Sequence, residues 1–128
     1  MTANEHEQVD RNKQLFSETS QRMWLKGDFS MFDDAFSPDY IGHVATGDRD
    51  REELKRRIAA FRERYPDASI TIEDQWGQGD KVVTRMTLRA IDITTGALIT
   101  QMGINITRFH DGKMVEEWNT WETLRAGG

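Results

Sequence analysis

The 128-residue sequence contains no cysteine, and this absence excludes several kinds of chemistry. Without thiols there is no disulfide bond, no thiolate nucleophile and no zinc site built on cysteine. Long hydrophobic runs are also missing, since a membrane helix needs about 18 or more consecutive apolar residues. The polar N-terminus, MTANEHEQVDRNKQ, shows no apolar core of a signal peptide. We therefore expect a cytoplasmic protein without a membrane segment.

A basic surface is lacking as well, because the net charge is −5. Proteins that bind nucleic acids carry a basic stripe. Lysine and arginine cluster only at residues 49–64, where glutamates are interleaved with them, as is typical of a solvated helix face. Phosphate-binding loops, zinc-protease motifs and dinucleotide fingerprints are absent too. The sequence predicts no nucleic-acid partner, no metal and no cofactor, so any chemistry would come from acid–base groups.

The first half of the chain has helical spacing of its apolar residues. Val9, Phe16 and Met23 recur every seven residues and predict a helix over 5–26 that ends at Gly27. A short helix is expected over 30–36, ended by Pro38. A third helix begins after Asp50, which can cap it with Glu53 at the third position. Behind this cap lies one apolar stripe: Leu54, Ile58, Phe61 and Tyr65.

From residue 68 onward the apolar period changes to two, which predicts strands over 69–76, 81–91, 98–109 and 113–123. The turn Asp111-Gly112 between the last two is a strong hairpin signal, because both turn residues must adopt positive φ. The expected fold class is α+β, with three N-terminal helices packed on a curved antiparallel sheet of about four to six strands. We expect a single domain over residues 1–128, with its core at 12–124.

The last predicted strand carries the leading candidate for chemistry, Glu122. Strand alternation from the Asp-Gly turn places Trp118 and Glu122 on one face, and Glu117, Asn119 and Trp121 on the other. If the first face is the inner one, the Glu122 carboxyl is desolvated, and its pKa rises toward the range of a general acid or base. Alternatively, Glu122 is solvated and pairs with an arginine.

Other polar residues are candidates for the same site. His43 follows Tyr40 where the chain would enter the mouth of a pocket, and histidine suits proton transfer near neutral pH. Arg85 and Asn105 interrupt otherwise apolar or hydroxyl-bearing strands, so they are either solvated or paired inside. Three further side chains are candidates for the wall of a pocket for a flat molecule, although such residues also build plain cores: Trp24, Met102 and Trp118.

An ordered set of short motifs resembles the SnoaL-like polyketide cyclases over residues 12–124. In chain order the set reads Trp24, Gly27-Asp28, Phe36-Ser37-Pro38-Asp39-Tyr40, His43, Tyr65-Pro66-Asp67, Ile72-Glu73-Asp74, Gly79-Asp80-Lys81-Val82-Val83, Arg85, Arg108-Phe109, Asp111-Gly112-Lys113-Met114-Val115-Glu116, and Trp118 with an acid four residues later. The resemblance implies the cone-shaped fold shared with nuclear transport factor 2, ketosteroid isomerase and limonene epoxide hydrolase. It also implies a deep apolar pocket and a dimer through the outer face of the sheet.

Cyclases of this family close a polyketide ring by an intramolecular aldol reaction without a cofactor. The family's acid/base aspartate falls on Glu122, which is one methylene longer. The resemblance therefore implies Glu122 as general acid or base, assisted by His43 and Arg85, on an apolar carbonyl-containing substrate. The implied substrate-binding residues are Trp118, Asn105, Trp24, Met102 and Tyr40.

Two functions of other classes stay open at this point. The domain could carry or sense a small molecule without turnover, or it could be a structural dimerisation module whose interior is filled by its own side chains. An open cavity would favour the first over the second. We also expect a homodimer through the sheet, because five residues suggest an uncovered apolar face: Val83, Thr84, Leu88, Ile104 and Ile106.

Overall fold

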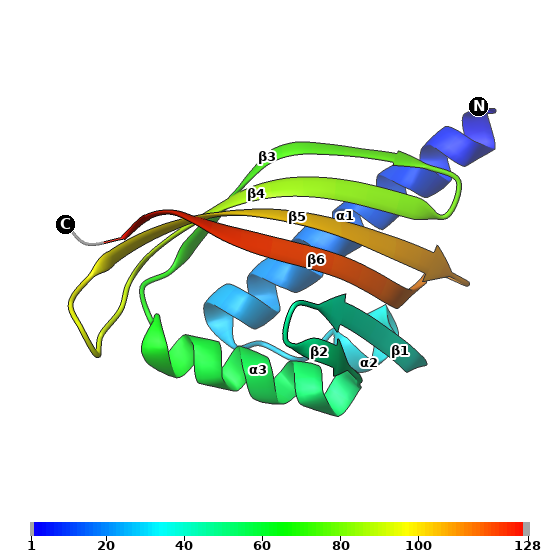
Figure 1. The fold of residues 1–128 in the computed structure, drawn as a ribbon. Coiled ribbons are helices and arrows are strands. Elements are labelled where there is room, and N and C mark those ends of the chain that lie inside the picture. The colour runs from blue at the N-terminus through cyan, green and yellow to red at the C-terminus, as the bar shows by residue number, and fades with distance from the viewer. Residues whose placement is uncertain (1, 127–128) are drawn as a thin grey trace.

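The computed structural model describes residues 2–126, with side chains described through Leu124. The predicted domain, residues 1–128, extends beyond this range at both ends. The first half contains helix α1 (Ala3–Lys26), the short helix α2 (Phe32–Ala35), strands β1 (Phe36–Val44) and β2 (Gly47–Arg49), and helix α3 (Arg51–Arg64). The second half contains β3 (Ser69–Gln78), β4 (Lys81–Ile91), β5 (Leu98–His110) and β6 (Lys113–Ala126), as Figure 1 shows.

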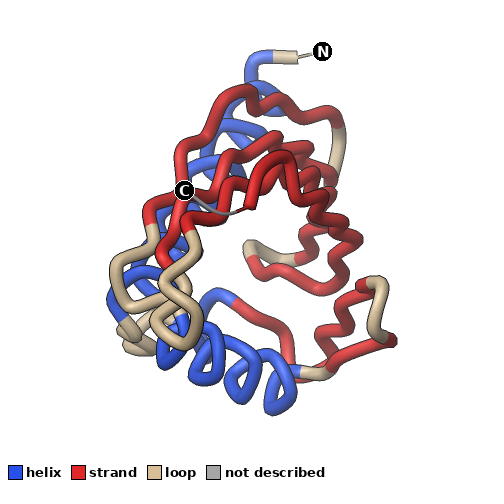
Figure 2. Tube along the Cα trace, turned by 60° about the vertical axis from the view of Figure 1, so that its left-hand side comes forward, coloured by secondary structure: helices blue, strands red, loops and turns tan. Residues whose placement is uncertain are grey.

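The six strands form one sheet in the order β2-β1-β6-β5-β4-β3. Neighbouring strands are antiparallel except β1 and β6, which run parallel. The predicted α+β class is confirmed, but the sheet is mixed instead of antiparallel. Helix α1 packs against β3 and β4, and α3 packs against β1 and β2. Figure 2 shows the strands bending around this helical layer.

Helix α1 agrees closely with its prediction. Val9, Phe16 and Met23 are buried, and Gly27 ends the helix with a φ of 65°, a left-handed conformation that glycine adopts without a steric penalty. At the other end, the Thr2 side chain accepts a hydrogen bond from the backbone of Glu5. No helix within residues 2–126 is long and apolar enough to cross a membrane.

Helix α3 begins as its capping motif predicts. The Asp50 carboxylate accepts a hydrogen bond of 2.9 Å from the backbone N–H of Glu53. The Glu53 side chain does not return to the cap but pairs with Arg56 and Arg57. Leu54 and Ile58 of the apolar stripe are buried.

The segment after α1 differs from its prediction. Helix α2 has only four residues, because strand β1 starts already at Phe36. The register of β1 against β6 is irregular between Phe36 and Ile41, where Pro38 has no N–H to donate to a sheet ladder. The hairpin of β1 and β2 was not predicted, and it brings residues 36–49 beside β6.

The four predicted strands of the second half are all present. Both residues of the β5–β6 turn have positive φ, with 51° at Asp111 and 74° at Gly112, which confirms the hairpin prediction. The β3–β4 turn uses Gly79, also at positive φ.

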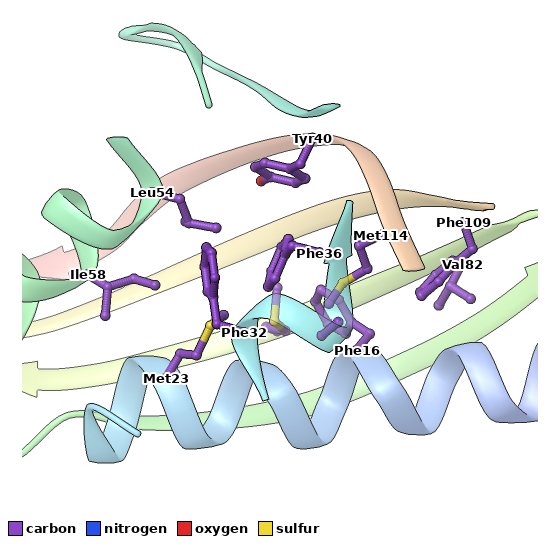
Figure 3. Packing of buried hydrophobic residues seen from close by; sticks show 12 residues of the cluster. Phe16, Met23, Phe32, Phe36, Tyr40, Leu54, Ile58, Val82, Phe109 and Met114 are labelled. Carbon is purple, nitrogen blue, oxygen red and sulfur yellow. The ribbon is translucent and has the colours of Figure 1, made fainter. Parts of the chain in front are cut away.

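The hydrophobic core lies between α1 and the inner face of the sheet. Figure 3 shows ten of its side chains converging from both helices and sheet: Phe16, Met23, Phe32, Phe36, Tyr40, Leu54, Ile58, Val82, Phe109 and Met114. The rings of Phe32 and Phe36 stack with centroids 4.9 Å apart, and Tyr40 meets Phe36 edge-on at the same distance. This packing fixes β1 against α2 and aims Tyr40 inward.

Candidate functional site

A cavity of about 550 Å³ lies between the helices and the inner face of the sheet. Its size is in the range of small-molecule sites. Its walls are largely apolar and come from α1, α3 and the strands: Phe16, Met23, Trp24, Leu54, Phe61, Ile70, Ile72, Met86, Leu88 and Trp121. Trp24 meets Phe61 edge-to-face with ring centroids 5.3 Å apart, so one stretch of the helical wall is aromatic.

The polar centre of the cavity is the carboxylate of Glu117 on β6, a residue only 5% exposed. The Tyr40 hydroxyl donates to Glu117 Oε1 at 2.8 Å, and the Thr107 hydroxyl donates to Oε2 at 3.0 Å. The Asn105 side-chain amide in turn donates to the Thr107 oxygen at 2.6 Å. Donors from β1 and β5 therefore fix this carboxylate of β6. Each of its oxygens retains capacity to accept one more hydrogen bond, because a carboxylate oxygen has two lone pairs.

Tyr40 is a permanent donor in this network. Burial first, and the adjacent Glu117 carboxylate second, raise the pKa of the Tyr40 hydroxyl above its usual value. The nearby Arg49 acts in the opposite direction. The Tyr40 hydroxyl stays protonated at neutral pH and can donate to Glu117.

Arg49 is the second charged residue buried in the cavity, and it is 7% exposed. It lies on β2 directly across from Gly42 of β1. A Cβ atom at position 42 would lie 2.8 Å from Arg49 Nε and 2.8 Å from the Tyr40 hydroxyl oxygen. Glycine at position 42 therefore makes room for the arginine and tyrosine side chains to lie together.

Glu122 does not reach the cavity, so its predicted position is wrong. Glu122 is exposed on the outer face, paired in register with Met102, whereas Glu117, Asn119 and Trp121 line the cavity. The reason is a bulge after the hairpin: the register passes from Met114–Phe109 to Glu116–Arg108, leaving Val115 as an extra residue. One extra residue moves every following side chain to the other face.

The predicted position of Trp118 is wrong for the same reason. The bulge places its ring on the outer face instead of in the wall of the cavity. Met102 is on that outer face as well, since its neighbours Gln101 and Gly103 face inward. Gly103 gives space to Trp121: a Cβ there would lie 2.6 Å from the indole ring. The aromatic residue of β6 in the cavity is therefore Trp121 in place of Trp118.

Arg85 and His43 point away from the cavity too, which corrects their predicted positions. Arg85 donates two hydrogen bonds, of 2.9 and 2.7 Å, to Asp74 on the neighbouring strand. His43 lies between Asp48 and Glu116 and stacks on Trp118 with ring centroids 5.5 Å apart. Adjacent residues of a strand face opposite sides, so the inward residues of β1 are Tyr40, Gly42 and Val44.

Three of the predicted residues are at the cavity. Trp24 and Asn105 line it, and Tyr40 reaches it through its hydrogen bond to Glu117. The sequence reasoning missed Glu117, Arg49, Asn119 and Trp121. The doublet Glu116-Glu117 next to a hairpin turn was the available signal, because a bulge there lets either glutamate face inward. Among residues 2–124, no group of three histidine or carboxylate side chains could hold a metal ion.

Comparisons with solved structures show where this fold occurs. IdmH from Streptomyces antibioticus, a proposed polyketide cyclase, has a TM-score of 0.76 at 23% identity, over 87% of this chain and 91% of that one. TsrD from Streptomyces laurentii has a TM-score of 0.78 at 23% identity, over 88% and 89%. A proposed SnoaL-like polyketide cyclase from Jannaschia sp. CCS1 has a TM-score of 0.81 at 14% identity, over 89% and 87%.

These identities are low, so the structural similarity shows the fold alone. No curated protein sequence matches the chain. The sequence model of the SnoaL-like domain, however, matches residues 18–117, which is more than half of the chain. The predicted resemblance is thereby confirmed, and the chain belongs to the SnoaL-like domain family.

Proposed function

We propose that this SnoaL-like domain binds a small, apolar, carbonyl-containing molecule in the cavity and transfers a proton with Glu117. The observation that supports this most directly is the buried Glu117 carboxylate, held by Tyr40 and Thr107 inside apolar walls. The name polyketide cyclase among the structural relatives agrees with such a substrate. The cavity itself disfavours a purely structural module, whose interior would be filled.

The chemistry needs only groups that the cavity contains. The Glu117 carboxylate would take a proton from a carbon next to a carbonyl group, which leaves an enolate and a neutral carboxylic acid. In a cyclisation, the enolate carbon would attack a second carbonyl of the same molecule, forming a carbon–carbon bond. The resulting alkoxide would take the proton back from Glu117. In an isomerisation, the proton would return to a different carbon.

The test is hydrogen–deuterium exchange of a flat ketone, α-tetralone, measured by NMR in D₂O. We expect the protein to accelerate exchange at the carbon next to the carbonyl, and Glu117→Gln to remove the acceleration while binding persists. General-base catalysis contributes roughly 10²- to 10⁴-fold. Glu122→Gln is the matched control, because it makes the same change on the outer face and should keep the full rate.

Two results would redirect the proposal. Equal exchange rates in Glu117→Gln and the unmodified protein would remove Glu117 from the chemistry. Binding of the ketone without any acceleration of exchange would indicate a non-catalytic carrier or sensor.

We further propose that two copies associate through the outer face of the sheet. The register aligns Trp76, Val83, Ile106 and Trp118 in one row across four neighbouring strands. Trp76 and Trp118 remain exposed in the single chain. Of the residues expected on this face, Thr84 and Leu88 are instead buried on the inner face, as strand alternation from Val83 requires.

A further inference from the structure

Arg49 is a buried cation without a carboxylate partner among residues 2–124. Its Nε atom is enclosed by protein and has no hydrogen-bond acceptor. Other arginines that line the cavity are paired: Arg57 contacts Glu53 at 3.1 Å, and Arg64 contacts Asp92 at 2.7 Å. Arg49 is also much less exposed than the side chain of Arg64, which is 55% exposed. Arg49, the more buried of these arginines, is therefore the one that lacks a carboxylate partner.

Burying an unpaired charge is unfavourable, because the protein does not replace the water that solvates it. The fold holds Arg49 in this position. Arg49 is the last residue of β2 and pairs with Gly42 of β1, and because glycine has no side chain, the arginine has space there. The fold therefore presents a guanidinium group to the cavity without neutralising it. A ligand with a negatively charged oxygen would pair with this charge through the two terminal nitrogens, since Nε itself is enclosed by protein.

The position of Arg49 relative to Glu117 narrows the kind of ligand. Both side chains are close to the Tyr40 hydroxyl, which donates to Glu117 and lies beside Arg49. Glu117 takes its hydrogen bonds from Tyr40 and Thr107 and forms no ion pair with Arg49. The two opposite charges thus lie beside the same hydroxyl without pairing with each other. Because Arg49 and Glu117 lie beside the same hydroxyl and both line the cavity, one ligand can contact both side chains.

We propose that Arg49 binds an anionic oxygen of the ligand, which is therefore an apolar molecule carrying a carboxylate or the enolate of a 1,3-dicarbonyl. This inference rests on the proposed small-molecule function of the cavity and specifies its ligand class. A guanidinium group suits such ligands because its planar fork can donate two parallel hydrogen bonds to two oxygens. For a 1,3-dicarbonyl ligand, Glu117 would take the proton from the carbon between the two carbonyl groups, and the same fork would stabilise the negative charge on the oxygen of the enolate that forms.

The first test compares two probes of nearly the same shape by isothermal titration calorimetry at pH 7.5. Naphthalene-2-carboxylate is anionic, and its methyl ester is neutral. We expect the unmodified protein to bind the acid about tenfold or more tightly than the ester, since a hydrogen bond to a charged group contributes about that factor or more. Arg49→Met should remove this preference by weakening the acid alone.

Two further variants separate the role of Arg49 from charge in general. Arg49→Lys keeps the charge without the fork, so a reduced preference for the acid should remain. Arg56→Met removes a positive charge from the exposed side of α3, outside the cavity, and should keep the full preference. A preference that survives in Arg49→Met, or that disappears in Arg56→Met, would overturn the inference.

The ligand source is distinguished by a third probe, 2-acetyl-1-tetralone, whose enolate absorbs in the near ultraviolet. If the natural ligand is an enolate, the bound probe should be ionised at lower pH than the free probe, and Arg49→Met should abolish the difference. Equal binding of acid and ester without enolate stabilisation would overturn the role of Arg49 and leave the small-molecule function intact. Failure of all three probes to bind would count against both.

Discussion

At the scale of single residues, His43 shows how a charged cluster can fasten one element of this fold to another. Its Nδ1 lies 2.9 Å from Asp48 of β2, and its Nε2 lies 2.7 Å from Glu116 of β6. The hydrogen bonds to Glu116 and then to Asp48 raise the pKa of His43 above 6.5. The hydrogen bond from His43 lowers the pKa of Glu116 below 4.5, and Arg108 also lowers it.

These two shifts predict how the stability depends on pH. The His43 contribution is complete below pH 6.5 and is lost as the pH rises through its higher folded-state pKa. The Glu116 contribution is present above pH 4.5 and is lost as the pH falls through its lower folded-state pKa. The pair therefore stabilises the fold most between these values. We expect His43→Gln to lower the melting temperature most near pH 5.5 and least near pH 8.5.

Thermal unfolding followed by circular dichroism at several pH values measures this dependence. His6→Gln is the control, since His6 is exposed on α1 and takes part in none of these contacts. A difference between His43→Gln and the unmodified protein that is the same at pH 5.5 and 8.5 would show that the ring contributes only by packing on Trp118.

Residue identity alone did not determine which side chains meet in the cavity. The acid expected in the cavity was Glu122, whereas the buried acid of β6 is Glu117. Alternation counts residues from the turn, and the extra residue at Val115 changes the count by one. The buried position of Arg49 was not predicted, for a different reason. It follows a glycine-containing turn in a charged stretch, and nothing nearby in the sequence indicates that its partner strand places it inside.

At the scale of elements, the cap of α3 is the clearest point where a local motif supports the cavity. Leu54 and Phe61 of this helix line the cavity, and the helix starts where the Asp50 carboxylate accepts the backbone N–H of Glu53. Replacing such a cap by alanine costs about 1 kcal/mol. We expect Asp50→Ala to lower the free energy of unfolding by about that amount. Asp50→Asn should be nearly neutral, because asparagine caps as well.

Urea unfolding at pH 7 measures both variants. If Asp50→Asn and Asp50→Ala lose equal stability, the effect comes from the negative charge near the helix terminus instead of the hydrogen bond. That outcome would contradict the capping role.

The elements that the sequence predicted well are those whose signal is local. Helices α1 and α3 have apolar stripes with caps, and the four C-terminal strands have period-two patterns with glycine turns. The β1–β2 hairpin lacks such a signal. Pro38 and Gly42 weaken the strand pattern, and β1 is stabilised by pairing with β6, more than 60 residues away in the chain. A strand that is stabilised by pairing with a distant segment has only a weak strand pattern in its own sequence.

At the scale of the whole molecule, the two faces of the sheet have different chemistry. The inner face supplies the cavity and its buried acid. The outer face carries the apolar row Trp76, Val83, Ile106 and Trp118, and Ile104 beside it is 40% exposed. The Arg85–Asp74 ion pair lies in the adjacent row and extends toward the edge strand. Apolar surface in the middle with charges toward an edge is typical of a protein interface.

The predicted dimer follows from this outer face, and Ile104→Lys tests it. In a two-fold interface, residue 104 of one copy lies near the same surface of the other, so the substitution introduces two desolvated like charges. We expect the unmodified protein to have twice the monomer mass by light scattering at micromolar concentration, and Ile104→Lys to be a monomer.

Ile93→Lys is the matched control, because Ile93 is 62% exposed in the β4–β5 connection, away from the apolar row. If the unmodified protein is monomeric, the outer face is not a self-association surface. If Ile93→Lys dissociates the dimer and Ile104→Lys does not, the copies meet at the β4–β5 connection instead. Circular dichroism of each variant establishes that the lysine changes association and not folding, since both isoleucines are already exposed in the single chain.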